Sequence, residues 1–300
     1  MTKLIEQLGS IGVLYKINEP MKNHTSFKTG GNAALFIEPK NSGELKEVLK
    51  LCNENQIPVF VLGKGSNLLV SDEGIKDRAV IHIAHGMDEI KLIDETTIVV
   101  GAGASLTSLC KFALANELSG LEFAYGIPGS CGGAAFMNAG AYGGEMKDVL
   151  YSCNHLDEKG NEGTFAGDEL DLSYRHSAYS GKSLVITSLT IKLKKGNKAE
   201  IESKMNELMS RRKDKQPLDY PSAGSVFKRP EGYFAGALIE QSGLKGKRIG
   251  GAMVSEKHAG FIINYDAATT NDVLELIRFC QQTVKEKFGV DLETEIRSIS

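Results

Sequence analysis

The sequence has no apolar run that approaches the roughly eighteen residues needed to cross a membrane. Its first segment, residues 1–15, is expected to form a short amphipathic helix and lacks the unbroken apolar core of a signal peptide. The formal net charge is only −3, and the one basic cluster, at 211–215, contains an aspartate. Nothing here favours a nucleic-acid partner. The sequence therefore predicts a cytoplasmic protein with no membrane partner and no evident obligate protein partner.

Paired cysteines are also missing. The five cysteines are odd in number and scattered, with no CxxC pair among Cys52, Cys110, Cys131, Cys153 and Cys280. This pattern argues against a disulfide framework or a zinc site and fits a reducing cytoplasm. The histidines at 82 and 85 are too isolated to suggest a metal, so no metal site is predicted.

The 300 residues, 41% hydrophobic and 24% charged, suffice for about two domains with ordinary cores. Hydrophobic spacing predicts further helices at 43–56, 105–118, 198–213, 235–242 and 271–288. Ser105 is a plausible N-cap for the second of these helices. Strands are expected at 58–63, 79–84, 97–103, 183–195 and 260–265, with a hairpin turning near 158–161. The class is α+β, with a domain boundary at about residue 195, where the KKGNK break begins.

The stretch GIPGSCGGAAFMNAGAYGGE, at 126–145, is very poor in side chains. Seven of its twenty residues are glycine, and it carries no charge before Glu145. Glycine costs conformational entropy on folding, so the backbone must need something that side chains would block. The two usual reasons are a tight packing corner and a large ligand pressed against the main chain.

Two further glycine motifs follow predicted strands, VLGKGSNLL at 61–69 and VVGAGASLT at 99–107. Both lack the third glycine of a Rossmann GxGxxG motif, because Leu68 and Leu106 occupy its position. Each motif alone is better explained as a tight turn. Together with 126–145 and TGGNA at 29–33, they favour backbone amides gathered around one large anion. The pattern predicts a dinucleotide site that is not of the Rossmann type.

TGGNA, GKGSNLLVSD and the 126–145 stretch, in that order, resemble the FAD-binding domain of the vanillyl-alcohol-oxidase / para-cresol-methylhydroxylase (PCMH) superfamily. LSYRHS at 172–177, PLDYPSAGSVFKRP at 217–230 and LETEIR at 292–297 are similar to one member, the UDP-N-acetylenolpyruvoylglucosamine reductase (MurB) family. The resemblance runs from about residue 20 to the C-terminus. It implies an enzyme of peptidoglycan precursor synthesis, in which FAD carries hydride from NADPH to the enolpyruvyl C=C bond of UDP-N-acetylglucosamine enolpyruvate.

The resemblance also implies a division of labour along the chain. Residues 1–195 form a PCMH-type FAD-binding domain with its core at about 28–194, and residues 196–300 form a smaller α+β substrate-binding domain. The C-terminal strand of the second domain completes the active site. The residues implied in cofactor binding are Gly63, Gly65, Ser66, Asn67, Leu68, Gly101, Ala102, Gly126, Ile127, Pro128, Gly129, Ser130, Gly132, Gly133, Ala134, Asn138, Gly140, Tyr142 and Gly143.

Three catalytic residues are implied by the same motifs. Ser225 corresponds to the proton donor, Arg175 to the electrophile that faces the substrate carboxylate and enolate, and Glu295 to the third catalytic position. A carboxylate beside a forming enolate must hydrogen-bond a neighbour or carry a proton. On local sequence alone, Ser225 is better explained as a turn residue and Arg175 as a surface arginine, and Glu295 could be a solvated glutamate; the motif match is what favours the catalytic roles.

Lys228, Arg211, Arg297 and His258 are the candidates for binding the nucleotide sugar. Arg211 and Arg212 also suit the C-terminal end of a helix as simple cations, and a lone histidine is often structural. The motif departs from the family where Arg229 stands in place of the more usual asparagine.

Only seven residues separate Arg175 from the strand expected at 183, so the chain resembles the class without a tyrosine-bearing loop insert. Tyr179 is then a candidate for covering the substrate.

Three other functions compete with this reading. An oxidase of the same superfamily would share the FAD motifs but react quickly with oxygen. A nucleotide-sugar binder without flavin would not need intact glycine motifs. A cysteine enzyme using Cys131 would be sensitive to thiol alkylation.

Overall fold

The computed structural model describes all 300 residues, and they divide into two compact units. The first unit comprises residues 1–17, 35–64 and 77–211, and the second comprises 18–34, 65–76 and 212–300. Each unit is thus built from three segments, whereas the sequence suggested a single cut near residue 195. The assignment of FAD and of substrate to separate domains stays a prediction.

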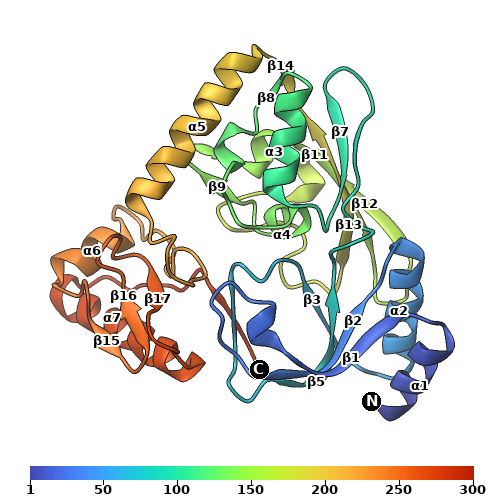
Figure 1. Cartoon of the computed structure of the whole chain (residues 1–300), viewed down its shortest axis with the longest axis horizontal. Helices are drawn as coiled ribbons and strands as arrows, with labels where there is room; N and C mark the ends of the chain where they lie inside the picture. Colours follow the sequence, from blue (N-terminus) through green and yellow to red (C-terminus); the bar gives the residue numbers. More distant parts are fainter. The chain divides into compact units, whose positions relative to one another are not determined.

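Seven α-helices lie along the chain (Figure 1). They are α1 (Thr2–Ser10), α2 (Ser42–Glu54), α3 (Leu106–Ala115), α4 (Cys131–Phe136), α5 (Lys198–Lys215), α6 (Ala235–Gln241) and α7 (Thr270–Phe288). The six helices predicted from hydrophobic spacing are confirmed. The helix that the sequence did not predict is α4, inside the glycine-rich stretch.

Eighteen short strands form six sheets. The strands are β1 (Leu14–Pro20), β2 (Asn32–Glu38), β3 (Val59–Leu62), β4 (Leu68–Val70), β5 (Ile75–His82), β6 (Ile90–Leu92), β7 (Thr97–Gly101), β8 (Leu118–Ser119), β9 (Gly140–Ala141), β10 (Gly144–Glu145), β11 (Leu150–Leu156), β12 (Glu162–Ala166), β13 (Val185–Lys192), β14 (Lys194–Lys195), β15 (Arg248–Ile249), β16 (Ala252–Val254), β17 (Ile262–Asn264) and β18 (Arg297–Ile299). The sequence placed the C-terminal strand too early, because Glu295 precedes β18.

The first unit is built around a five-stranded sheet in the order β12-β11-β13-β7-β6. The predicted hairpin is confirmed as β11 and β12, which pair antiparallel. Helices α3 and α4 lie beside this sheet, as Figure 1 shows. A four-stranded sheet in the order β1-β2-β5-β3 also belongs to the fold, and α1 packs on α2 in the same unit. The first unit's core is continuous and apolar.

Ser105 begins α3 as the sequence predicted. Its hydroxyl accepts a hydrogen bond from the amide of Ser108 at 2.9 Å, which satisfies one of the free donors of the first helical turn. Ser130 does the same for α4, where its hydroxyl accepts from the amide of Gly133 at 3.3 Å.

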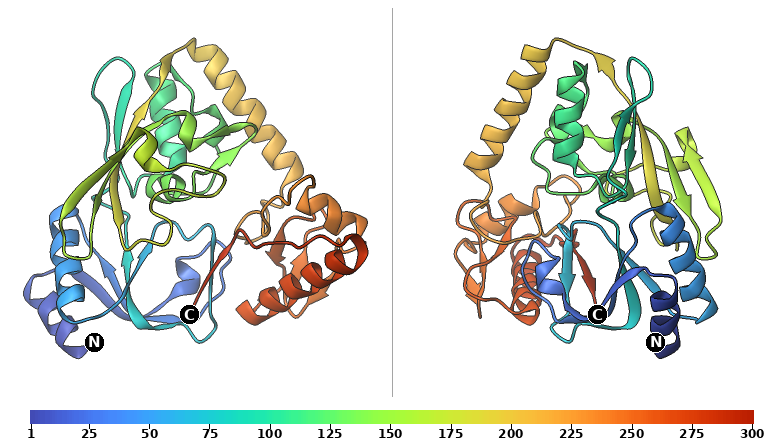
Figure 2. Two further views of the ribbon diagram at one scale, coloured as in Figure 1. Left: turned by 180° about the vertical axis from the view of Figure 1, so that it is seen from behind. Right: turned by 45° about the vertical axis from the view of Figure 1, so that its right-hand side comes forward.

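The second unit has its own core, in which α7 packs on a three-stranded sheet of order β15-β16-β17. Both views of Figure 2 show the red helix α7 beside these orange strands. In the same unit, β18 pairs in parallel with β4, which joins the C-terminus to residues 68–70. No helix of the chain combines the length and apolarity that a membrane span requires, and no group of three potential metal ligands lies together.

A reciprocal cap fixes the start of α7. The Thr269 hydroxyl accepts from the amide of Asp272 at 3.1 Å, and the Asp272 carboxylate accepts from the amide of Thr269 at 2.9 Å. The same carboxylate accepts from the amide of Gly251 at 3.1 Å, which ties α7 to the β15–β16 turn. Burial alone would raise the pKa of Asp272, but the amides of Thr269 and Gly251 outweigh it and hold that pKa below its ordinary value.

The substitution Asp272→Asn should therefore lower the free energy of unfolding by about 1 kcal/mol at pH 7, because two amides lose a charged acceptor. The carboxylate's contribution is present above its ordinary pKa of about 4 and is lost as the pH falls through the lower folded value. Urea unfolding at pH 7 and pH 3 should show a difference between wild type and variant that shrinks in acid.

Glu275→Gln is the matched control. Glu275 is exposed one turn further along α7 and accepts from the Asn271 side chain, so its loss should change stability by under about 0.5 kcal/mol at either pH. An Asp272 effect of the same size at both pH values would contradict the role given to the charge.

Candidate active site

Three of the glycine-rich segments meet in the first unit. Ser105 and Ser130 form an antiparallel bridge, and the amides of Cys131 and Gly132 donate to the carbonyls of Ala104 at 2.8 Å and Ala102 at 2.9 Å. A Cβ atom on Gly63 would collide with the Ser130 hydroxyl, so the end of β3 lies directly against this junction. The expectation that these motifs gather is confirmed for the segments at 63, 101–105 and 126–133.

The glycines of α4 are small for two different reasons. A Cβ on Gly132 would lie 2.8 Å from the Ala102 Cβ atom, so Gly132 is required by packing within the protein. Gly133 is exposed, and a Cβ there would meet only the Ser130 hydroxyl, at 3.2 Å. Gly133 therefore leaves open surface that a side chain would fill. Such a bare, exposed backbone fits a large planar or anionic cofactor better than it fits a packing corner.

The fourth glycine segment, TGGNA, belongs to the second unit and packs there against residues 70–74. The residues implied in flavin binding therefore belong to both units. Those at 63, 101–102, 126–134 and 138–143 lie in the first unit, and Gly65, Ser66, Asn67 and Leu68 lie in the second. The Asn67 side chain donates to the Glu295 carbonyl at 3.0 Å, and the Arg297 amide donates to the Asn67 carbonyl at 3.1 Å.

Arg175 stands on a tight turn of the first unit. Ser173 and His176 exchange backbone hydrogen bonds around it, and its φ of 56° is in the left-handed region. The guanidinium lies over the Tyr174 ring, 4.9 Å from the ring centroid, and one of its nitrogens is 3.5 Å from the Gly140 carbonyl oxygen. The turn therefore places a permanent positive charge beside the glycine-rich stretch.

Ser225 lies in an extended segment of the second unit that is held on both sides. It bridges to Phe261, and the Val226 amide donates to the Gly260 carbonyl at 2.9 Å. On the other side, the Glu295 amide donates to the Val226 carbonyl at 2.7 Å. Backbone hydrogen bonds thus bring Ser225 and Glu295 within one residue of each other across the ladder. The absent side chain of Gly260 leaves room for the Ser225 hydroxyl.

His258 adjoins this segment as a neutral imidazole. Burial lowers the pKa of His258, its Nδ1 accepts from the Gly260 amide at 3.1 Å, and its ring packs edge-on against Phe261 at 5.0 Å. Nδ1 is therefore an acceptor, which places the ring proton on Nε2. Nε2 is the atom with which this residue can reach a ligand.

Two of the candidate phosphate-binding cations are paired with acidic residues. The Lys228 ammonium is paired with the Glu293 carboxylate in the second unit. Arg211 pairs with Glu207 at 3.1 Å, one turn earlier on α5. Arg297 begins β18. At Lys228 and at Arg211, a bound phosphate would have to displace an exposed carboxylate. Each of these carboxylates binds its cation weakly, because water screens both ion pairs.

One candidate residue and one rival function in the first unit are ruled out. Tyr179 is 1% exposed, and its hydroxyl donates to the Cys153 carbonyl at 3.3 Å and contacts His155, so it cannot cover a substrate. Cys131 is fully buried, and burial raises the pKa of its thiol well above the ordinary value. A thiol without access or thiolate character cannot serve as a nucleophile, which removes the cysteine-enzyme alternative.

Comparison with protein families assigns both parts of the chain. Residues 33–164 match the model of an FAD binding domain, and residues 216–299 match the model of the UDP-N-acetylenolpyruvoylglucosamine reductase C-terminal domain. The α+β fold with a flavin-type domain is thereby confirmed. A glucose dehydrogenase, wild-type Phl p 4.0202, superposes with a TM-score of 0.50 at 15% identity over 65% of this chain and 44% of its own, which shows fold alone.

Several relatives match over their whole length. The UDP-N-acetylenolpyruvoylglucosamine reductase of Caldanaerobacter subterraneus subsp. tengcongensis is 51% identical over 99% of this chain and 98% of its own. That of Listeria innocua serovar 6a is 48% identical over 100% and 99%. The crystal structure of the Thermus caldophilus enzyme (MurB) superposes with a TM-score of 0.81 at 38% identity, covering 96% of this chain and 99% of that one. The chain belongs to the UDP-N-acetylenolpyruvoylglucosamine reductase family.

Proposed function

We propose that this protein is an NADPH-dependent flavin oxidoreductase that reduces UDP-N-acetylglucosamine enolpyruvate to UDP-N-acetylmuramate, a peptidoglycan precursor. Family membership supports this reaction. The observation within the molecule that supports it is a backbone ladder, in which the Glu295 amide donates to the carbonyl of Val226, the residue after Ser225. This ladder places a hydroxyl residue and a carboxylate residue in one local segment, and these are the residue types that proton transfer to a substrate carbon can use.

FAD, when bound, supplies the carrier that takes hydride from NADPH and gives it to the enolpyruvyl β-carbon. The exposed glycine backbone at 133 and the segments at 63–68, 101–102, 126–130 and 138–143 would hold it. We assign cofactor binding to residues 1–195 and substrate binding to residues 196–300. All five thiols are buried and unpaired, which is compatible with action in the cytoplasm.

Hydride arriving at the β-carbon leaves negative charge on the α-carbon and the adjoining carboxylate. We assign to Arg175 the stabilisation of that charge, because a guanidinium offers planar, bidentate hydrogen bonds to a carboxylate. Ser225 donates the proton to the α-carbon, and Glu295 orients or recharges that hydroxyl. Lys228, Arg211, Arg297 and His258 contact the nucleotide sugar.

Absorption spectroscopy without oxygen tests the whole proposal. The purified protein should show flavin bands that bleach with NADPH and return when UDP-N-acetylglucosamine enolpyruvate is added. A flavin that bleaches but recovers only in air would favour an oxidase. A colourless protein that cannot be reconstituted with FAD would contradict the flavin assignment.

Ser225→Ala should separate the two half-reactions. Only the second needs the serine proton, so flavin reduction by NADPH should stay within about twofold of wild type while reoxidation by substrate falls about 100-fold or more. Stopped-flow measurement of each half-reaction decides this. If both survive unchanged, Ser225 is not the donor.

Gly133→Val and Gly132→Val form a matched pair for the cofactor site. The Gly133 variant should fold normally yet purify without flavin, since its side chain would project from exposed backbone. The Gly132 variant should also lower the melting temperature, because its side chain would collide with Ala102. Flavin absorbance and thermal unfolding measure the two effects. A fully yellow Gly133→Val protein would show that FAD does not lie over this residue.

A further inference from the structure

Arg175 adopts a backbone conformation that an arginine disfavours. Its φ of 56° places it in the left-handed region, which glycine, asparagine and aspartate occupy far more readily. Such a conformation persists only where the surroundings fix it, and it tends to occur at functional sites. The contacts around the turn therefore decide where the guanidinium points.

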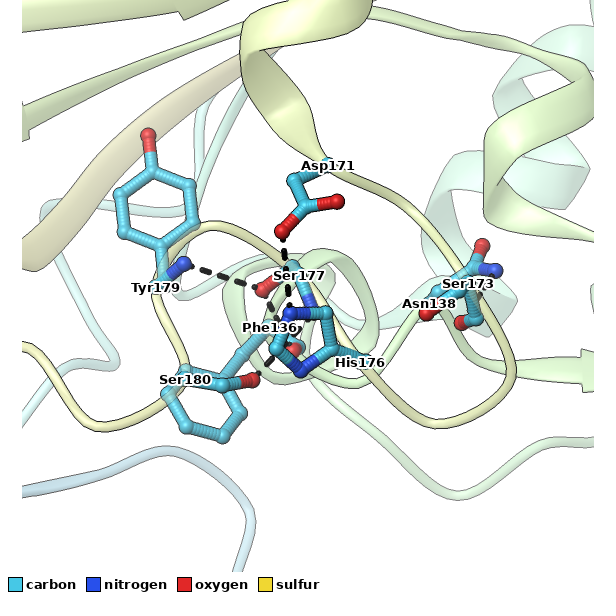
Figure 3. Close-up of polar contacts among 8 residues, drawn as sticks. All are labelled: Phe136, Asn138, Asp171, Ser173, His176, Ser177, Tyr179 and Ser180. Atoms are coloured by element: carbon cyan, nitrogen blue, oxygen red, sulfur yellow. Dashed lines mark hydrogen bonds and ion pairs between the residues drawn. The ribbon is translucent and has the colours of Figure 1, made fainter.

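Two side-chain hydrogen bonds hold this turn in place, one before Arg175 in the sequence and one after it. Two residues before it, the Ser173 carbonyl accepts from the Asn138 side-chain amide at 3.0 Å. Two residues after it, the Ser177 hydroxyl donates to the Phe136 carbonyl at 2.7 Å. Figure 3 shows Ser177 beside Phe136 and Ser173 beside Asn138.

The two residues whose side chains make these bonds are buried, since Asn138 is 0% and Ser177 is 1% exposed. Asn138 is also fully used within the protein. Its amide nitrogen donates to the Glu145 carboxylate at 2.6 Å as well as to Ser173, and its carbonyl oxygen accepts from the Lys147 amide at 2.8 Å. The Asn138 side chain thus serves the turn and the glycine-rich stretch, and the flavin role expected for it falls to its backbone.

The far side of the turn is anchored separately. The Ala178 amide donates to the Leu170 carbonyl at 2.8 Å, and the Asp171 carboxylate contacts the His176 ring at 3.2 Å. Ser180 lies in the same loop, and its hydroxyl accepts from the Ser177 amide at 3.3 Å. These contacts hold the loop closed, and the bonds from Asn138 and Ser177 fasten it to residues 136–138.

We propose that Ser177 and Asn138 are positioning residues that hold Arg175 against the glycine-rich stretch, and that Ser177 acts on the reaction only through Arg175. The inference rests on the proposed function, in which Arg175 stabilises charge on the substrate. The Phe136 carbonyl belongs to the last turn of α4 and has no acceptor role within that helix. Ser177 therefore joins the arginine's turn to the helix whose other end carries Gly133.

A double-mutant cycle on the flavin-loaded enzyme tests the proposal. Ser177→Ala should keep wild-type flavin content and reduction by NADPH, but reoxidise with UDP-N-acetylglucosamine enolpyruvate about 10-fold more slowly, because the guanidinium is misplaced. In an Arg175→Ala background, the same change should cost less than about twofold more. Asn138→Ala should also slow reoxidation by the substrate, and by a smaller factor when Arg175 is absent.

Ser180→Ala is the matched control and should reoxidise within about twofold of wild type, since its hydroxyl does not reach residues 136–138. Three results would overturn the proposal: normal reoxidation in Ser177→Ala, an equal loss with and without Arg175, or loss of flavin from Ser177→Ala. A wild-type enzyme that this substrate fails to reoxidise would instead refute the proposed function.

Discussion

The junction at Ser130 is the constraint on which the first unit's site depends. One hydroxyl caps α4 through the Gly133 amide and fills the space left by the missing Cβ of Gly63. The adjoining amides of Cys131 and Gly132 are tied to the segment after β7. Since a helix of six residues has little stability of its own, these contacts rather than helix propensity determine where α4 lies.

In the proposed function, each end of α4 has a role. Its first turn presents the exposed glycine backbone assigned to the cofactor, and its last turn accepts the Ser177 hydroxyl that fastens the turn of Arg175. Because α4 is a single short helix, the distance between its two ends is constant. In the proposed reaction, one short helix would thus position both the flavin and the guanidinium that stabilises the product's charge, and catalysis depends on such control of reacting distances.

The sequence predicts most of the scaffold because long amphipathic helices and a hairpin repeat their signals over many residues. It could not predict α4, whose glycines and alanines show no hydrophobic periodicity. It placed Glu295 on a strand, although regular pairing starts only at Arg297. It offered Tyr179 as a cover because an aromatic in a loop looks exposed, while tertiary packing buries it. The positioning role of Asn138 depends on contacts 35 residues away, which no local pattern encodes.

The two candidate catalytic side chains are held by different means. Ser225 is fixed through the next residue, because the Val226 amide donates to the Gly260 carbonyl and the Val226 carbonyl accepts from the Glu295 amide. This ladder demands little of the surrounding side chains except a small residue at 260. Arg175 relies on two specific side chains and a strained conformation. The position of Ser225 should therefore tolerate substitutions nearby. The position of Arg175 should change when a hydrogen-bonding atom of Asn138 or Ser177 is removed.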